Sequence, residues 1–293
     1  TERGVIFEEI GMCEDNPEDL CAERLSTAVF HGSALARPIL GKRSTLEKMT
    51  GASLRTYMTE HYRPQDLVVA LAGSFTQRDV DDLTVRFGAL EEGPGPKTDK
   101  AVYTPAFTLK KKAIEQNHLT LAFPGIAYGD ERRYALQLLS AMLGSGMSSR
   151  LFQRIREEMG AAYSVYSFPS TYTNCGTFTV YAGTSPETAQ QVADELLRQI
   201  RLLRDGGVTQ EEFDMAKEQL KVSYVLGLES SSARMSAIGR SKLLRGHAVD
   251  PQDVIRKIEA VTKEDVERVA HRMFGRPFSA SAVGRNIDGL KLL

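Results

Sequence analysis

The sequence lacks the features that mark several classes of protein. Its 293 residues include three cysteines and no Cys-x-x-Cys pair, so no disulfide framework is expected and a reducing compartment, the cytoplasm, is favoured. The sequence has no apolar run long enough to cross a bilayer and no start typical of a signal peptide. The net charge is −1, from 37 basic and 38 acidic residues. Neither nucleic acid nor a membrane is therefore expected as a partner.

The composition is that of a globular protein. Apolar residues make up 42% and charged residues 26% of the chain, and 293 residues suffice for two ordinary domains. A Gly-Pro alternation at 91–97 resists both helix and sheet and predicts an interdomain linker. We therefore expect a first domain at residues 1–90, a linker at 91–104 and a second domain at 105–293.

Two stretches, at 46–73 and 258–284, have similar sequences. Thr50 pairs with Thr262 and Leu54 with Val266, which is the same offset of 212 residues (262−50 and 266−54). Such similarity predicts a duplicated unit, although two generic helix-strand units would also look alike. Counting back from Phe107 by this offset leads to a position before Thr1. The first copy is thus expected to have lost its front part, and the chain looks like a truncated protein.

The expected secondary structure combines hairpins with runs of helices. Strands are predicted at 66–72, 107–113, 118–123, 163–171 and 177–182, and helices at 2–13, 17–30, 53–62, 77–87, 130–143 and 148–159, the last ended by Gly160. Further helices are expected to open at Ser185-Pro186-Glu187, at a Thr209–Glu212 capping box and at Asp250-Pro251. This pattern predicts an α+β fold in which each domain has a mainly antiparallel sheet with helices on one face.

Two carboxylates stand on the apolar side of the first expected helix. At about 100° per residue, Glu9 falls between Val5 and Met12, and Glu2 lies two turns earlier on the same line. Burying an ionised carboxylate is costly unless a cation or a strong donor meets it. We therefore interpret Glu9 as one ligand of a metal site. The alternative is a helix packed so loosely that both acids reach water.

Several segments resemble the pitrilysin/insulinase family of zinc peptidases, whose branch nearest to this chain includes mitochondrial processing peptidase and its bacterial relatives. ERGVIFEEI at 2–10 resembles the helix that supplies the family's third zinc ligand, and RPILG at 37–41 is similar to a segment downstream of it. LGSGMSSRLFQRIREEMGAAYSVYS at 143–167 matches the family's glycine-rich turn, helix and Arg/Tyr pair. The resemblance extends over nearly the whole chain.

The resemblance implies zinc as the cofactor. Family members bind Zn²⁺ through the two histidines of an HxxEH helix, whose Glu is the general base, and through a Glu on a following helix. By this match Glu9 is the third ligand, and Glu2 is an outer carboxylate that orients a ligand. The HxxEH motif is absent, because no two of the five histidines are four residues apart. We expect the motif in a missing N-terminal segment upstream of Thr1.

The resemblance assigns a catalytic role to Arg156 and Tyr163, which reach across from the second domain toward the zinc of the first. A guanidinium and a phenol are suitable donors for a peptide carbonyl and for the oxyanion formed during hydrolysis. Without the resemblance, Arg156 would be interpreted as a helix-surface residue and Tyr163 as a core residue. Gly144, Gly146 and Ser148 resemble the glycine-rich substrate loop of the noncatalytic processing-peptidase subunit. A flexible connection between two helices is the alternative.

The function expected from these features is that of a zinc-dependent metalloendopeptidase. It would cleave unfolded peptides or presequence-like segments in a chamber between facing domains. Because such a chamber needs four domains, the resemblance implies a homodimer or a pairing with a noncatalytic paralogue. The chain alone is expected to be inactive without the HxxEH helix. The alternative is a noncatalytic peptide-binding or scaffold subunit of a processing-peptidase-like complex.

Overall fold

The computed structural model describes residues 2–93 and 99–292, and the chain divides into two compact units. Unit 1 comprises Thr1–Lys42, Lys100–Leu220 and Ile258–Leu293, and unit 2 comprises Arg43–Asp99 and Lys221–Lys257. Residues 94–98 of the predicted linker lie outside the described residues. Residues 1–42, assigned above to the first domain, group with the second half of the chain. The boundaries at 90 and 105 stay a prediction.

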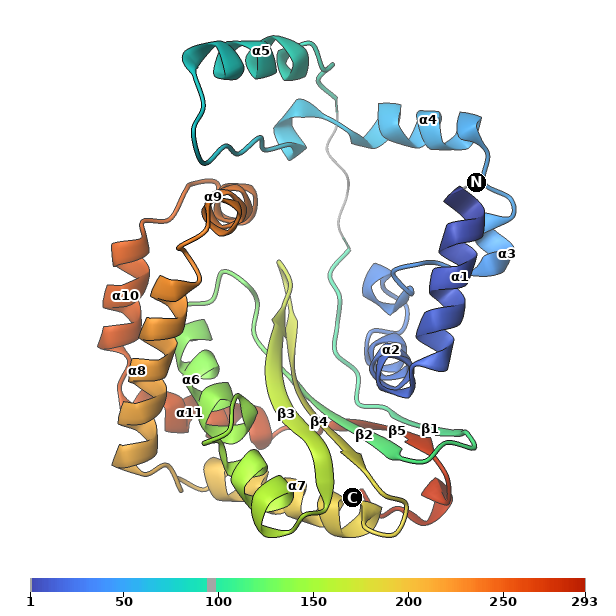
Figure 1. The fold of residues 1–293 in the computed structure, drawn as a ribbon, viewed down its shortest axis with the longest axis vertical. Coiled ribbons are helices and arrows are strands. Elements are labelled where there is room, and N and C mark those ends of the chain that lie inside the picture. The colour runs from blue at the N-terminus through green and yellow to red at the C-terminus, as the bar shows by residue number, and fades with distance from the viewer. Residues whose placement is uncertain (1, 94–98, 293) are drawn as a thin grey trace. The chain divides into compact units, whose positions relative to one another are not determined.

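Unit 1 is built on a five-stranded sheet with the order β1-β5-β2-β4-β3 (Figure 1). The strands are β1 (Phe107–Lys111), β2 (Asn117–Pro124), β3 (Ala162–Thr171), β4 (Gly176–Thr184) and β5 (Ser279–Gly284). Every neighbouring pair is antiparallel except β1 and β5, which are parallel. The predicted α+β class is confirmed, and the strands of the second half are found at the predicted places.

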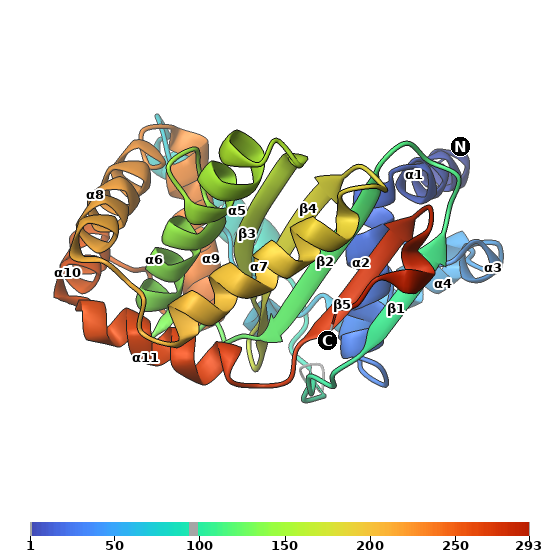
Figure 2. The same ribbon diagram turned by 90° about the horizontal axis from the view of Figure 1, so that it is seen from below.

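The helical segments of unit 1 surround this sheet. They are α1 (Glu2–Asp15), α2 (Pro17–Val29), η1 (Ala34–Ala36), α6 (Arg133–Gly144), η3 (Phe152–Glu158), α7 (Ala189–Arg204), α11 (Lys263–Phe274), η4 (Ile287–Gly289) and α8 (Gln210–Leu226), whose last residues belong to unit 2. Helices α7 and α2 lie on opposite faces of the sheet (Figure 2). On the α11 side, the Phe123 and Phe274 rings pack 4.9 Å apart. On the α2 side, the Thr120 hydroxyl donates a hydrogen bond to the Cys21 sulfur, 3.3 Å away. Helices therefore cover both faces, not one face as predicted.

The regular elements among the described residues of unit 2 are all helical segments joined by irregular chain. Its segments are α3 (Arg43–Leu46), α4 (Gly51–His61), η2 (Pro64–Asp66), α5 (Gln77–Gly88), α9 (Ser231–Arg245) and α10 (Pro251–Ala260), whose last residues belong to unit 1. Within residues 2–93 and 99–292, no helix combines the length and apolar character needed to cross a membrane.

The two similar stretches share a helix start. Thr50 caps α4 through a capping box with Ser53, and Thr262 caps α11 in the same way with Asp265. The stretches differ at their ends, because the second ends in β5 and the first ends without a strand. The strand predicted at 66–72 is therefore wrong for the described chain. A strand needs a neighbour that accepts and donates its backbone hydrogen bonds, and no described segment supplies one there.

Candidate functional site

The structure brings Arg156 and Tyr163 together. Arg156 lies in η3, a π-helical segment closed by a hydrogen bond from the Met159 amide to the Arg154 carbonyl, and Tyr163 is the second residue of β3. The guanidinium carbon of Arg156 lies 4.9 Å from the Tyr163 ring centroid, within cation–π range. Gly160, with φ +60°, provides the left-handed turn that returns the chain from η3 toward β3. The regular helix predicted at 148–159 is thus replaced over most of its length by a wider turn.

Both side chains of this pair are accessible. Tyr163 is 73% exposed, which excludes the core position considered for it. The Arg156 side chain is 37% exposed, and its nearest carboxylate, Glu157, lies 3.9 Å away. Arg156 can therefore still offer hydrogen bonds to a ligand that reaches Tyr163.

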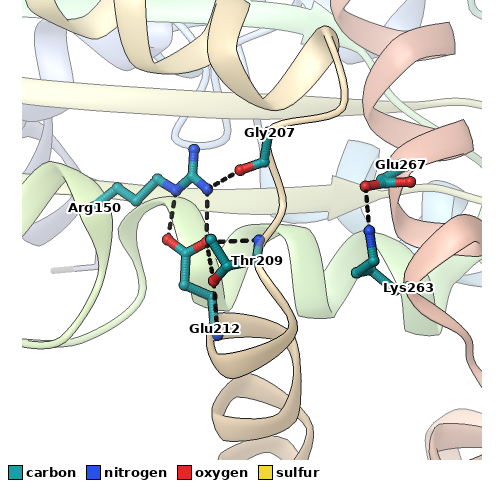
Figure 3. Close-up of polar contacts among 6 residues, drawn as sticks. All are labelled: Arg150, Gly207, Thr209, Glu212, Lys263 and Glu267. Carbon is teal, nitrogen blue, oxygen red and sulfur yellow. Dashed lines mark hydrogen bonds and ion pairs between the residues drawn. The ribbon is translucent and has the colours of Figure 1, made fainter.

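An ion pair fixes the segment that leads into η3 (Figure 3). Arg150 donates from Nε and Nη2 to the two carboxylate oxygens of Glu212, at 2.6 Å each, and from Nη2 to the Gly207 carbonyl. Glu212 also accepts hydrogen bonds from the Thr209 amide and hydroxyl at 3.1 and 3.0 Å, so the predicted capping box of α8 is confirmed. Burial acts to raise the pKa of Glu212, but the hydrogen bonds from Arg150 and Thr209 outweigh it and lower the pKa.

The Glu212→Gln substitution is expected to destabilise the fold by about 2–3 kcal/mol, because it leaves the largely buried Arg150 guanidinium without its counter-charge. The difference between wild type and variant should be full above pH 4.5, the ordinary value for this carboxyl. It should shrink as the pH falls below that value, since the lowered pKa of Glu212 stabilises the fold only while the group is ionised. Urea unfolding of both proteins across this pH range measures the effect.

Glu267→Gln is the matched control for this substitution. It breaks the other ion pair in Figure 3, in which Lys263 donates to Glu267 at 2.8 Å within one turn of α11. Pairs of this kind contribute little to stability. An equal loss in both variants would contradict the structural role given to Glu212.

The glycine-rich loop has a structural explanation at Gly144. A Cβ at this position would lie 2.5 Å from the backbone nitrogen of Ser167 and 2.9 Å from the carbonyl carbon of Tyr166. Only glycine lets the end of α6 approach β3 this closely. At the contact, the Ser140 and Ser145 hydroxyls donate to the Ser167 carbonyl at 3.0 and 3.1 Å. Gly146 and Ser148 are exposed, and a role of the loop in substrate binding stays a prediction.

Glu2 and Glu9 are both exposed on α1. The residues that flank Glu9 on the helix, Val5 and Met12, are 49% and 71% exposed, and Ile10 is the buried residue of this helix. The enclosure predicted for Glu9 is therefore wrong for this chain, and the alternative of water-accessible acids holds. The physical reason is that α1 packs on α2, while the face with Glu9 has no cover among the described residues.

The described residues do not form a complete metal site. No group of three His, Cys, Asp or Glu side chains able to hold a metal occurs in residues 2–93 and 99–292. Within the same ranges, no hydrogen bond, ion pair or ring contact joins Glu2 or Glu9 to Arg156 or Tyr163. An exposed carboxylate is a suitable single ligand for zinc, which needs at least three protein ligands. Glu9 thus fits zinc as one ligand of a site completed by other residues.

A half-buried polar cluster that no sequence pattern singled out joins α2 to the sheet. The Tyr166 hydroxyl donates to the Glu18 carboxylate, and the Tyr181 hydroxyl lies 2.7 Å from His118 Nδ1. Burial, together with the Glu18 charge, raises the pKa of both tyrosines, and burial lowers the pKa of His118. The only sequence signal was the alternation of polar and apolar residues in the strands. This cluster attaches the α1–α2 pair to β3, the strand that begins beside Tyr163.

Residues 48–220, more than half of the chain, match the sequence profile of the peptidase M16 inactive domain. The chain belongs to the peptidase M16 family. The family resemblance of the sequence is thereby confirmed. Arg156, Tyr163 and the glycine-rich loop lie within the matched M16 region, whereas Glu2 and Glu9 precede it.

Curated M16 relatives carry the name zinc protease. The chain is 37% identical to the uncharacterized zinc protease YmxG of Bacillus subtilis, over 96% of this chain and 69% of that protein. It is 39% identical to an uncharacterized zinc protease of Streptomyces coelicolor, over 97% of this chain and 64% of that protein. The chain thus spans 64–69% of the length of these two relatives.

Solved structures share the fold. A peptidase M16 inactive domain from Pseudomonas fluorescens superposes with a TM-score of 0.87 at 22% identity, covering 96% of this chain and 69% of that one. A protease from Helicobacter pylori gives a TM-score of 0.84 at 21% identity, covering 97% and 70%. At this identity the likeness establishes the M16 fold alone.

Proposed function

We propose that this chain is part of a zinc-dependent metalloendopeptidase whose HxxEH helix lies outside these 293 residues. The observation that carries the proposal is the Arg156–Tyr163 pair, two accessible side chains in which the guanidinium carbon lies 4.9 Å from the ring centroid. Membership of the M16 family and relatives named zinc proteases support it.

The roles of the chain's own residues follow from their chemistry. Glu9 would be one zinc ligand, and Glu2 would orient a ligand from outside the coordination sphere. Zinc, when bound, supplies Lewis-acid chemistry that polarises a peptide carbonyl. The Tyr163 hydroxyl would donate a hydrogen bond to the carbonyl oxygen. Arg156 would stabilise the negative charge that develops on that oxygen during hydrolysis.

The substrates and the assembly belong to the same proposal. We expect unfolded peptides or presequence-like segments as substrates, because main-chain hydrogen bonds can hold many sequences in an extended form. A homodimer, or a pairing with a noncatalytic paralogue, would complete the chamber, and the cytoplasm is the proposed location.

A second candidate is a noncatalytic peptide-binding or scaffold subunit. The match to the inactive M16 domain at 48–220 favours it. A subunit of this kind would bind peptides without hydrolysing them.

The two candidates are separated by measurements on the intact protein. The peptidase should contain about one zinc ion per chain and cleave an unfolded fluorogenic peptide. A chelator should abolish cleavage, and added zinc should restore it. Peptide binding without zinc and without cleavage would establish the noncatalytic subunit and overturn the peptidase.

A further inference from the structure

A pocket of about 540 Å³ lies in unit 1, at the end of the sheet where β2 ends and β4 begins. Its walls come from the loop after Pro124, the turn at 174–176, the segment 100–103 and the C-terminal part of α11. Strand β3 runs between this turn and Tyr163, and its 10 residues extend over roughly 30 Å. The pocket is therefore separate from the Arg156–Tyr163 pair.

Most of the charged side chains that line this pocket are positive. Lys100, Arg132, Arg272 and Arg276 line it together with one carboxylate, Asp130, so its side chains carry a net charge of +3 (four positive against one negative). The chain as a whole is nearly neutral, at −1. A local excess of this size in a concave site raises the concentration of anions there.

The single carboxylate that lines the pocket, Asp130, already accepts hydrogen bonds from Arg132. Asp130 accepts a 2.9 Å hydrogen bond from Arg132 Nε and a second one from Arg132 Nη2, and Arg272 also interacts with its charge. The interaction of Arg272 with Asp130 is through charge alone, and none of Arg272, Arg276 and Lys100 forms an ion pair with a carboxylate in residues 2–93 and 99–292. At least two positive charges are therefore left to a ligand.

The remaining lining shows which kind of anion fits. Val269 and Met273 of α11 and Ile126 of the loop provide apolar wall, and the volume lies in the range of small-molecule sites, far above that of a bare ion. Cys175 also lines the pocket, but burial raises the pKa of its thiol. A raised pKa disfavours the thiolate, the form in which a cysteine acts as a nucleophile.

We propose that this pocket is a binding site for a small organic phosphate, whose phosphate group is held by Arg272 and Arg276 and whose organic part packs on the apolar wall. A phosphate monoester carries a charge near −2 at neutral pH, which matches the excess of positive charge better than one carboxylate does. Guanidinium groups bind phosphate oxygens through paired, charge-assisted hydrogen bonds. The site is independent of the proposed peptidase activity.

Isothermal titration calorimetry of the intact protein tests the proposal, with AMP, inorganic phosphate, adenosine and citrate at one ionic strength. AMP should bind saturably, inorganic phosphate more weakly, and adenosine not at all. Citrate binding as tight as that of AMP would overturn the phosphate assignment. The absence of saturable binding by both AMP and phosphate would overturn the site itself.

Variants of Arg272 in α11 and of Arg276, which follows this helix, locate the binding. Arg272→Gln and Arg276→Gln should each weaken AMP binding by about tenfold or more, and together by about a hundredfold. Both residues are exposed, so the thermal melt should be unchanged. Arg268→Gln is the control, because Arg268 lies one turn earlier on α11, pairs with Asp265 and does not line the pocket. It should change AMP affinity by less than about twofold, and an effect equal to that of Arg272→Gln would show nonspecific attraction and overturn the proposal.

Discussion

Replacing Glu9 by glutamine is expected to remove zinc and peptidase activity from the intact protein while leaving its fold unchanged. Glutamine keeps the size of the side chain and removes the charge that a zinc ligand needs. Changes outside the coordination sphere, such as Glu2→Gln, typically cost roughly 10- to 100-fold in metal affinity, and loss of a ligand should exceed this range. Zinc content by mass spectrometry and cleavage of an unfolded peptide measure the two effects.

The exposure of Glu9 makes this experiment selective. Because the side chain reaches water and has no hydrogen bond among the described residues, its substitution costs the fold little, and any loss reports on zinc. Glu8→Gln is the matched control, since Glu8 is also exposed and points about 100° away around α1. A Glu9→Gln protein with full zinc content and full activity would show that Glu9 is not a zinc ligand.

Tyr163→Phe and Arg156→Lys should each lower kcat/KM of the intact protein by about 10²- to 10³-fold, equivalent to about 2.7–4 kcal/mol of transition-state stabilisation. Phenylalanine keeps the ring on which Arg156 lies and removes only the hydroxyl donor. Lysine keeps the positive charge but not the planar fork that binds an oxyanion through two hydrogen bonds. The loss should fall mainly on kcat, since the developing oxyanion exists only during the reaction.

The fold should tolerate both substitutions. The cation–π contact between Arg156 and an exposed ring is worth about 0.5–1 kcal/mol, so melting temperatures should hardly change. Arg154→Lys is the matched control, because Arg154 lies in the same π-helical segment and pairs with Glu158 and Glu195 instead. Its kcat/KM should equal that of the wild type. Normal turnover by Tyr163→Phe and Arg156→Lys would show that the pair has only a structural role.

The candidate site was predictable from the sequence only in part. The resemblance singled out Arg156 and Tyr163, and the structure places them 4.9 Å apart. Their contact depends on the π-helical turn and on Gly160, of which only Gly160 gave a sequence signal. The Glu18–Tyr166 and His118–Tyr181 contacts join residues 148 and 63 positions apart. No local pattern could have predicted them, because the first forms only when α2 packs on the sheet and the second only when β2 pairs with β4.

Helical periodicity did not predict that Glu9 is exposed. Helical periodicity placed Val5, Glu9 and Met12 on one side of α1, and that geometry follows from the period of 3.6 residues alone. Whether that side is buried depends on which segment covers it, and the described chain leaves it exposed. Periodicity therefore gives the direction of a side chain but not its surroundings.

The sequence by itself determined the α+β class, four of the five strands of unit 1 and the cap at Thr209. These features depend on alternation, capping and turn chemistry, which act over a few residues. Only the tertiary structure decided that β1 lies parallel to β5, that α2 covers the second face of the sheet, and that 66–72 forms no strand. Pairing and packing join residues far apart in the chain, so their outcome depends on all the partners that are present.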